Sequence, residues 1–305
     1  MTDPTTIDAA AIYRAIQGQA RSQSARTGRP VATGDLLTRH ALESFLTRLT
    51  LTEHAESFVL KGGVLLSAYD VRRPTRDLDS EAVDIALTAE RITQVVRDVV
   101  AVAASDGVVF DTARIDVAVI RDDAAYSGLR MRVPVTIATW KGTVAWDIST
   151  GDPIVPEPHH VTIPRVLGDP ITVLGYRPEN VIAEKGVTIL ERGTTSTRWR
   201  DYVDIVQLTR RYAIDPDELR HASQAVATYR GVTLTPITPA ITGYGAVGQA
   251  KWAAWRRKER LDDISDPDLD TQMRHVADIL DPVFAGGEVG ALPLDDGQEN
   301  AGQDL

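Results

Sequence analysis

The chain has 305 residues, with 33 Lys and Arg against 43 Asp and Glu, a formal net charge of −10, and no cysteine. This length exceeds one average domain and leaves room for two. The absence of cysteine excludes disulfides, thiolate zinc sites and thiol catalysis. No apolar run approaches the length of a membrane span, and the N-terminal segment lacks the basic start and apolar core of a signal peptide. We therefore expect a cytoplasmic protein without a membrane partner.

The first 55 residues are predicted to form N-terminal helices. Apolar side chains recur at spacings of three and four over 9–26 and 33–49, which predicts two helices. Thr33 or Asp35 is a candidate cap for the second helix. The apolar run 57–60 predicts the first strand, and a short helix over 63–70 is expected to follow it.

Two carboxylates, Asp77 and Asp79, follow a proline-containing turn after that helix. Residues at i and i+2 of a strand project from the same face, so we expect the two carboxylates together, with Leu78 on the core side. Adjacent hard oxygen ligands suit a Mg²⁺ ion that also holds substrate phosphates. Gly62 and Gly63, just before, allow close backbone approach to a ligand. A lone Asp-x-Asp is commonly a solvated surface pair, but its combination with the glycine turn favours a functional site.

The next segments alternate between strand and helix signals. We predict a strand over 77–87, a helix over 88–105 capped by Thr88, and a β-rich segment over 108–120 with a break near Thr112. The segment 129–140 then alternates, with its apolar residues opposite Arg130 and Arg132.

A second alternating segment, 142–150, follows at once. Lys141 and Gly142 are expected to form the tight hairpin turn between the two. Asp147 lies in the middle of this strand, where an unpaired carboxylate is costly if buried. A metal or a pocket wall would resolve that cost. The alternative is an edge strand with Asp147 facing solvent.

The C-terminal part changes to helical patterning after a proline-rich stretch. Helices are predicted over 178–193, 196–212, 215–231, 245–261 and 268–286. Between 178 and 260 there are thirteen Lys and Arg against nine Asp and Glu, a local excess of four positive charges. The excess indicates either RNA phosphate contacts, with Arg256, Arg257 and Lys258 as candidates, or a solvated helical surface. Trp252 and Trp255, beside them, are expected in a core. Residues 286–305 read as a disordered acidic tail.

The order of these motifs resembles the minimal nucleotidyltransferases, whose signature is Gly-Gly or Gly-Ser followed at short distance by Asp-x-Asp or Asp-x-Glu. More narrowly, residues 55–210 resemble the AbiEii/AbiGii toxin family, which includes the mycobacterial MenT toxins. Three further segments support the narrower resemblance, 143–153, 180–193 and 196–208. Val64 departs from the many relatives with Ser or Thr at this position, so the loop is expected to contact phosphate through its backbone.

This resemblance implies an α+β fold, in which a minimal nucleotidyltransferase domain has a mixed β-sheet flanked by helices. The expected domains are N-terminal helices over 1–55, the nucleotidyltransferase core over 56–165, and a mainly helical C-terminal domain over 166–285 that completes the active site. The implied cofactor is Mg²⁺ or Mn²⁺, and the implied substrate is an NTP. A tail over 286–305 follows.

The resemblance also implies site residues. The implied catalytic set is Asp77, Asp79, Asp147, Lys185 and Asp204, of which the first three are metal ligands. Lys185 is implied to bind phosphate, with Asp204 orienting it and Asp201 in support; on its residues alone it also reads as a lysine snorkelling to solvent. The candidate nucleotide contacts are Lys61, Gly62, Gly63, Thr75, Arg76 and Lys185. For Thr75 and Arg76 the alternative is an ordinary turn.

The leading functional hypothesis is a toxin that adds nucleotides to RNA. Resemblance to the MenT group implies the tRNA 3′ acceptor end as target, a block of aminoacylation and translation, and a separate antitoxin encoded by a neighbouring gene. Two alternatives stay open, namely a small-molecule nucleotidyltransferase of the aminoglycoside-modifying kind and a non-catalytic interaction protein on the same fold. The sequence leaves open which NTP is used and how many chains associate.

Overall fold

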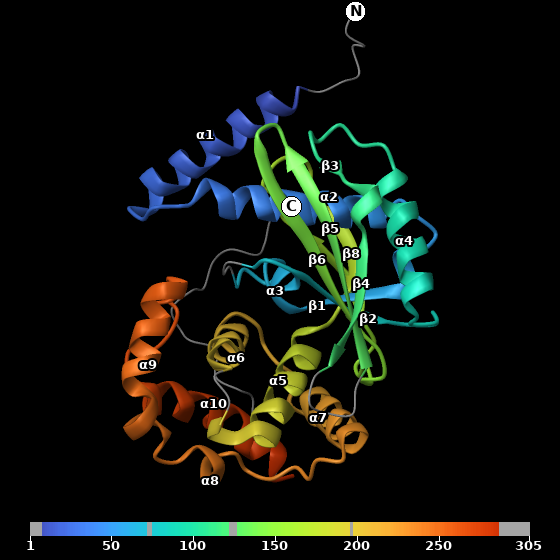
Figure 1. Cartoon of the computed structure of the whole chain (residues 1–305). Helices are drawn as coiled ribbons and strands as arrows, with labels where there is room; N and C mark the ends of the chain where they lie inside the picture. Colours follow the sequence, from blue (N-terminus) through green and yellow to red (C-terminus); the bar gives the residue numbers. More distant parts are fainter. Residues whose placement is uncertain (1–7, 72–74, 122–126, 196–197, 287–305) are drawn as a thin grey trace, which may run out of the picture. The chain divides into compact units, whose positions relative to one another are not determined.

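The computed structural model describes residues 8–71, 75–121, 127–195 and 198–286. These residues divide into two compact units of an α+β protein (Figure 1). The first unit contains the described parts of 1–151 and 159–175, and the second contains those of 152–158 and 176–305. The expected tail lies outside the described residues, apart from Gly286. Within the described ranges, no helix is long and apolar enough to cross a membrane.

A mixed eight-stranded sheet is the frame of the first unit (Figure 1). Its order is β3-β5-β6-β2-β1-β8-β7, and β4 also pairs with β5. β2 runs parallel to β6 and β1 parallel to β8, while the other pairs are antiparallel. The strands are β1 (Phe58–Lys61), β2 (Leu78–Ala82), β3 (Val109–Phe110), β4 (Asp116–Arg121), β5 (Ser127–Ile137), β6 (Trp140–Ser149), β7 (His159–Ile163) and β8 (Ile171–Gly175).

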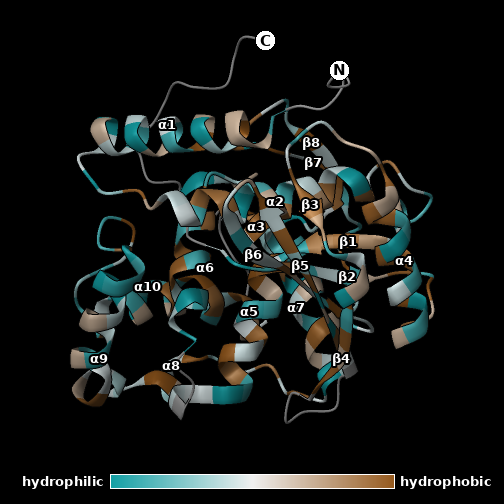
Figure 2. Ribbon diagram, turned by 45° about the horizontal axis from the view of Figure 1, so that its top comes forward, coloured by the Kyte–Doolittle hydropathy of each residue, from teal (hydrophilic) through white to brown (hydrophobic). Residues whose placement is uncertain are grey.

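The helices of this unit follow the predicted order. They are α1 (Ala9–Thr27), α2 (Thr33–Leu49), α3 (Gly62–Leu65) and α4 (Ala89–Ala101), with 3₁₀ turns at Ala55–Ser57 and Thr112–Arg114. The second 3₁₀ turn is the break that was expected near Thr112. Hydrophobic and hydrophilic residues alternate along α4 (Figure 2), and its buried residues, Ile92, Val95, Val96 and Val99, recur at helical spacing. Thr88 caps this helix as predicted, by accepting the Arg91 N–H at 3.2 Å.

Aromatic side chains join α2 to the sheet. The ring of Trp146 on β6 lies 5.4 Å from the Phe45 ring on α2 and 4.5 Å from the Phe58 ring on β1, both edge to face. Trp146, Leu78 and Met131 are buried, which confirms the predicted inward faces of β2, β5 and β6. The polar residues between them, Asp79, Asp147 and Arg130, therefore lie on the opposite face of the sheet.

Three local expectations were wrong in this unit. α2 begins at Thr33, so its N-cap is Ala32, which makes no side-chain cap bond, and Thr33 and Asp35 lie inside the first turn. β2 ends at Ala82 instead of continuing to 87, because Asp84 has a φ of 54° that an extended strand cannot contain. The helix after Gly62 ends at Leu65.

The hairpin turn between β5 and β6 also differs from the expectation. Ile137 pairs with Trp140, so residues 138 and 139 make the turn, and Ala138 has the positive φ of 51°. Lys141 and Gly142 lie inside β6, opposite Thr136 and Val135. A Cβ at Gly142 would come within 2.2 Å of the Trp140 ring. The glycine therefore makes room for that ring and does not form the turn.

The second unit is helical, as its patterning predicts. It contains α5 (Pro178–Arg192), α6 (Trp199–Arg211), α7 (Pro216–Arg230), α8 (Thr238–Ile241), α9 (Tyr244–Glu259) and α10 (Leu269–Phe284), with a 3₁₀ turn at Gly193–Thr195. α8 was not predicted, because four residues are too few to show a period. Trp252 is fully buried, which confirms the core interpretation for this residue. Trp255 stacks on it at 5.2 Å between ring centroids but is only half-buried.

Candidate active site

A row of four charged residues crosses the sheet of the first unit. Lys61 on β1 is the register partner of Asp79 on β2, Asp79 is the partner of Asp147 on β6, and Asp147 is the partner of Arg130 on β5. Register partners on neighbouring strands project from the same face. The row therefore places two carboxylates side by side, with a cation at each end. β6 lies between β2 and β5, so the edge-strand alternative for Asp147 is wrong.

Gly62 makes room for the carboxylate of Asp79. A Cβ added at residue 62 would lie 2.0 Å from Oδ2 of Asp79 and 2.5 Å from its Cγ. Gly62 also has a φ of 66°, a conformation that L side chains rarely adopt. The glycine after β1 is therefore needed for two reasons: it adopts the positive φ of the turn, and it leaves room for the Asp79 carboxylate.

Arg130 holds Asp147 through two hydrogen bonds. Its Nε donates to Oδ1 of Asp147 at 2.6 Å, and its Nη2 donates to Oδ2. The pKa of Arg130 is raised, chiefly by this hydrogen bonding, with further contributions from the charges of Asp147, Asp77 and Asp79. An ion pair thus resolves the cost of a carboxylate in the middle of β6.

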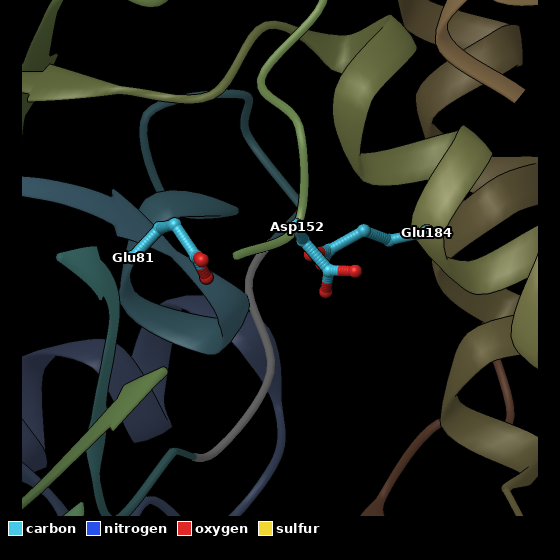
Figure 3. Close-up of side chains that lie close together, drawn as sticks. All are labelled: Glu81, Asp152 and Glu184. Carbon is cyan, nitrogen blue, oxygen red and sulfur yellow. The ribbon is translucent and has the colours of Figure 1, made fainter. Parts of the chain in front are cut away.

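Glu81 was missed by the sequence reasoning, although it lies two residues beyond Asp79 on the same strand. Its side chain, drawn in Figure 3, is buried. Its Oε2 accepts a hydrogen bond from Lys61 Nζ at 2.9 Å and another from Ser149 Oγ at 2.7 Å. The i+2 spacing that united Asp77 and Asp79 extends to Glu81, so the signal was present. Glu81 ties the Lys61 ammonium to the same face of the sheet.

A second charged cluster lies within the helical unit. Lys185 on α5 contacts two carboxylates on α6, Asp201 Oδ1 at 2.6 Å and Asp204 Oδ2 at 2.9 Å. Arg198 Nε donates to the other oxygen of Asp201 at 2.6 Å. Burial alone would raise the pKa of Asp201, but the charges of Lys185 and Arg198 outweigh it and hold the pKa below its usual value. Arg200 pairs with Glu259 instead.

The other two acidic side chains in Figure 3, Asp152 and Glu184, belong to the helical unit and were also not singled out from the sequence. Asp152 accepts two hydrogen bonds from Arg230, Nε to Oδ1 at 3.0 Å and Nη2 to Oδ2 at 2.6 Å. Glu184 accepts the Tyr176 hydroxyl at 3.3 Å. The first contact joins Asp152 to α7 and the second joins Tyr176 to the middle of α5, both within the helical unit.

The comparison with protein families decides the identity of the chain. Residues 44–280, well over half of the chain, match the family model described as nucleotidyl transferase AbiEii toxin, type IV toxin–antitoxin system. The chain belongs to the AbiEii family. It is thus a member of a family of nucleotidyltransferase toxins, as the resemblance of its motifs implied. A search of curated proteins gives no match.

Two solved structures are similar to this AbiEii chain. JHP933 from Helicobacter pylori is 15% identical, with 83% of this chain and 93% of that chain covered and a TM-score of 0.48. A second H. pylori protein, described as a nucleotidyltransferase, is 16% identical, with 83% and 96% covered and a TM-score of 0.49.

The carboxylates on the sheet of this AbiEii protein are of the type that divalent cations take as ligands. Asp79 and Asp147 offer hard oxygen ligands from directly paired strand positions, and the missing Cβ of Gly62 leaves the Asp79 carboxylate its space. Asp77 precedes β2 by one residue and is partly exposed. Its carboxylate is the third candidate ligand.

The remaining candidate contacts of this AbiEii chain differ in exposure. Thr75 Oγ1 donates to the Asp77 carbonyl at 3.4 Å, and Arg76 is exposed. Arg256 is buried, and its Nη2 donates to the Ser265 carbonyl at 2.7 Å. Arg257 and Lys258 are exposed. Of the three basic residues in this run, these two present their charge to solvent.

Proposed function

We propose that this AbiEii chain is a Mg²⁺-dependent nucleotidyltransferase toxin that transfers a nucleoside monophosphate from an NTP to the 3′ acceptor end of tRNA and so blocks translation. The observation that carries the proposal is the direct pairing of Asp79 with Asp147, with Asp79 seated on Gly62, in a chain of this family. Mn²⁺ is a suitable substitute for Mg²⁺ because both take carboxylate oxygen ligands.

The proposed reaction forms one bond and breaks one. The terminal hydroxyl oxygen of the RNA bonds to the α-phosphorus of the NTP, the bond from that phosphorus to the bridging oxygen breaks, and pyrophosphate leaves. The hydroxyl proton passes to a carboxylate of the sheet. The metal, when bound, neutralises phosphate charge and favours loss of that proton. Asp77, Asp79 and Asp147 are its proposed ligands.

Lys185 is proposed to bind phosphate as a compact ammonium. Asp201 and Asp204 hold its Nζ at 2.6 and 2.9 Å, so its position is fixed before substrate arrives. Lys61, Gly62, Gly63, Thr75 and Arg76 are the further proposed nucleotide contacts. Backbone N–H groups at Gly62 and Gly63 suit a phosphate that approaches the end of β1.

RNA is the favoured acceptor because one stretch of the helical unit, residues 178–260, carries more Lys and Arg than Asp and Glu. Thirteen Lys and Arg against nine Asp and Glu lie between 178 and 260, in a chain whose net charge is −10. Arg257 and Lys258 are the proposed exposed contacts. The type IV system named by the family model makes an antitoxin the expected partner, and the cytoplasm, where tRNA is charged, is the proposed location.

The test is transfer of label from each α-labelled NTP to total tRNA in the presence of Mg²⁺, followed on a denaturing gel. Asp79→Asn is the inactive variant, and Asp84→Asn is its matched control, because Asp84 is exposed just beyond β2. We expect label on tRNA with wild type and Asp84→Asn, and none with Asp79→Asn. Label in Asp79→Asn would refute the site. Labelling of an aminoglycoside without RNA would favour the small-molecule alternative.

A further inference from the structure

Both oxygens of the Asp147 carboxylate are held by one guanidinium. Arg130 reaches them with Nε and Nη2 from the directly opposite position on β5. The same carboxylate is a proposed metal ligand, so the inference drawn from this contact rests on the proposed function. A bidentate Arg–carboxylate pair is geometrically specific and stronger than a hydrogen bond between neutral groups.

Arg130 supplies positive charge where carboxylates gather. The charges of Asp77 and Asp79 also interact with its guanidinium, so this cation interacts electrostatically with three carboxylates. Lys61, at the other end of the row, donates to Glu81. Asp147 and Asp79 lie on neighbouring strands roughly 4.8 Å apart. Without the positive charge of Arg130, the repulsion between their two carboxylates would be less compensated.

A divalent cation at Asp147 would meet the guanidinium that already occupies both carboxylate oxygens. A metal bound to Asp147 would lie close to the positive charge of Arg130, and like charges at such a distance repel. The Arg130 side chain is 36% exposed, whereas the Arg48 side chain, paired with Asp106 within the same unit, is 4% exposed. The guanidinium of Arg130 therefore has solvent into which it can move, while that of Arg48 does not.

The ion pair is not needed to hold the two strands together. β5 and β6 are in register continuously from Leu129 and Ile148 to Ile137 and Trp140. Their buried residues, such as Met131 and Trp146, pack on the other face. An arginine that only stabilised the hairpin would have no effect on metal affinity beyond a general loss of structure.

We propose that Arg130 occupies Asp147 in the metal-free protein, leaves it when a divalent cation binds, and then contacts the phosphates of the nucleotide. Arg130 thus lowers the affinity for metal alone and raises the affinity for nucleotide with metal. The protein would therefore bind a metal–nucleotide complex more tightly than the metal alone. The opposite signs of the two effects distinguish this role from a structural one.

The test compares Arg130→Gln with Arg132→Gln, a control two residues along the same strand whose side chain is exposed. Binding of Mn²⁺ alone is followed by the spin-resonance signal of free Mn²⁺, and binding of a non-hydrolysable α,β-methylene NTP with Mg²⁺ by calorimetry. For Arg130→Gln we expect Mn²⁺ affinity to rise about tenfold, the scale of one neighbouring charge. Analogue affinity should fall about tenfold, the scale of a lost charge-assisted hydrogen bond. Arg132→Gln should change neither.

Unchanged or weaker Mn²⁺ binding by a folded Arg130→Gln protein overturns the competition, and unchanged analogue binding overturns the phosphate contact. Arg130→Lys keeps the charge but not the bidentate geometry, so it should bind Mn²⁺ with intermediate affinity; it provides the measurement should the Gln variant fail to fold. Wild-type transfer to tRNA with Mn²⁺ affinity insensitive to Arg130 would sink this inference and leave the proposed function standing. Tighter Mn²⁺ binding by Arg130→Gln, together with no transfer to tRNA by the wild type, would support this inference and refute the proposed function.

Discussion

Gly62 and Asp79 are so close that a methyl group on the glycine would occupy the space of the carboxylate. The distance from an added Cβ to Oδ2 of Asp79 is 2.0 Å. Because Gly62 is the first residue of α3, the carboxylate lies beside the first turn of that helix. The glycine turn and the Asp-x-Asp motif, separate in the sequence, thus form one structural feature.

Gly62→Ala is expected to reduce nucleotide transfer at least ~100-fold, the scale of displacing a catalytic group. The new methyl group forces Asp79 aside, and the positive φ adds about 1–2 kcal/mol of strain. Gly28→Ala is the matched control, because Gly28 has a φ of 68° and nothing within 4 Å of an added Cβ. Initial rates and melting temperatures of both variants make the comparison. Equal losses of transfer in the two variants would show that backbone strain alone is responsible.

Lys185→Met is expected to reduce transfer at least ~100-fold, on the scale of one lost preorganised charge contact. It should also destabilise the helical unit by about 3–5 kcal/mol, because Asp201 and Asp204 are left buried without their shared cation. Adding Asp204→Asn should restore part of the stability but none of the activity. Single-turnover rates and urea unfolding separate the two effects.

The control for this prediction is Lys251→Met, which removes an exposed lysine on α9. It should leave both rate and stability near wild type. Wild-type single-turnover rates in Lys185→Met would mean that the lysine only balances the buried carboxylates.

Asp106 is expected to make stability depend on acid pH. Burial would raise its pKa, but hydrogen bonds from Arg48 and Ser44 outweigh this and hold it below its usual value of 3.8. A depressed pKa in the folded state contributes stability that is fully present above the unfolded value and is lost as pH falls through the folded value. Asp106→Asn should therefore lower the urea midpoint at pH 7, and its deficit should shrink below pH 3.8. Asp116→Asn, at an exposed site on β4, should show no such trend.

Arg257→Ala with Lys258→Ala is expected to weaken tRNA binding and to flatten its dependence on salt. Each lost phosphate contact should reduce the slope of log K against log salt by about one unit. Arg256 is left in place because it is buried and bonds to the Ser265 carbonyl. The matched control is Arg91→Ala with Arg97→Ala, which removes two exposed charges from α4. Equal losses in both double variants would mean that only net charge matters.

Local periodicity was sufficient to predict most elements of the chain. α2 covers the predicted 33–49, and α5 begins at Pro178 and ends before Gly193. The inward faces of β5 and β6 also followed from alternation, because side-chain direction in a strand repeats every two residues. The same period predicted that Asp77 and Asp79 project together from one strand, but β2 begins at Leu78, so Asp77 lies one residue before it.

Glycines predicted turns less reliably, because a glycine can be required either for its backbone conformation or for its missing side chain. Gly142 was taken for a turn, yet it lies in β6 and makes room for the Trp140 ring. Gly193 does end α5, as predicted. A one-dimensional pattern does not distinguish a glycine that is needed for its backbone angles from one that is needed for its missing side chain.

The sequence alone determined which strand residues alternate and where most of the helical segments lie, since these patterns depend on neighbours a few positions away. Only the tertiary structure decided that β6 is an inner strand, that Asp147 is paired with Asp79 and held by Arg130, and that Arg256 is buried. Strand order and register bring together residues far apart in the chain, and no local period encodes them. From the sequence, Arg130 could be placed only on the face opposite Met131, because its partner Asp147 lies on the next strand.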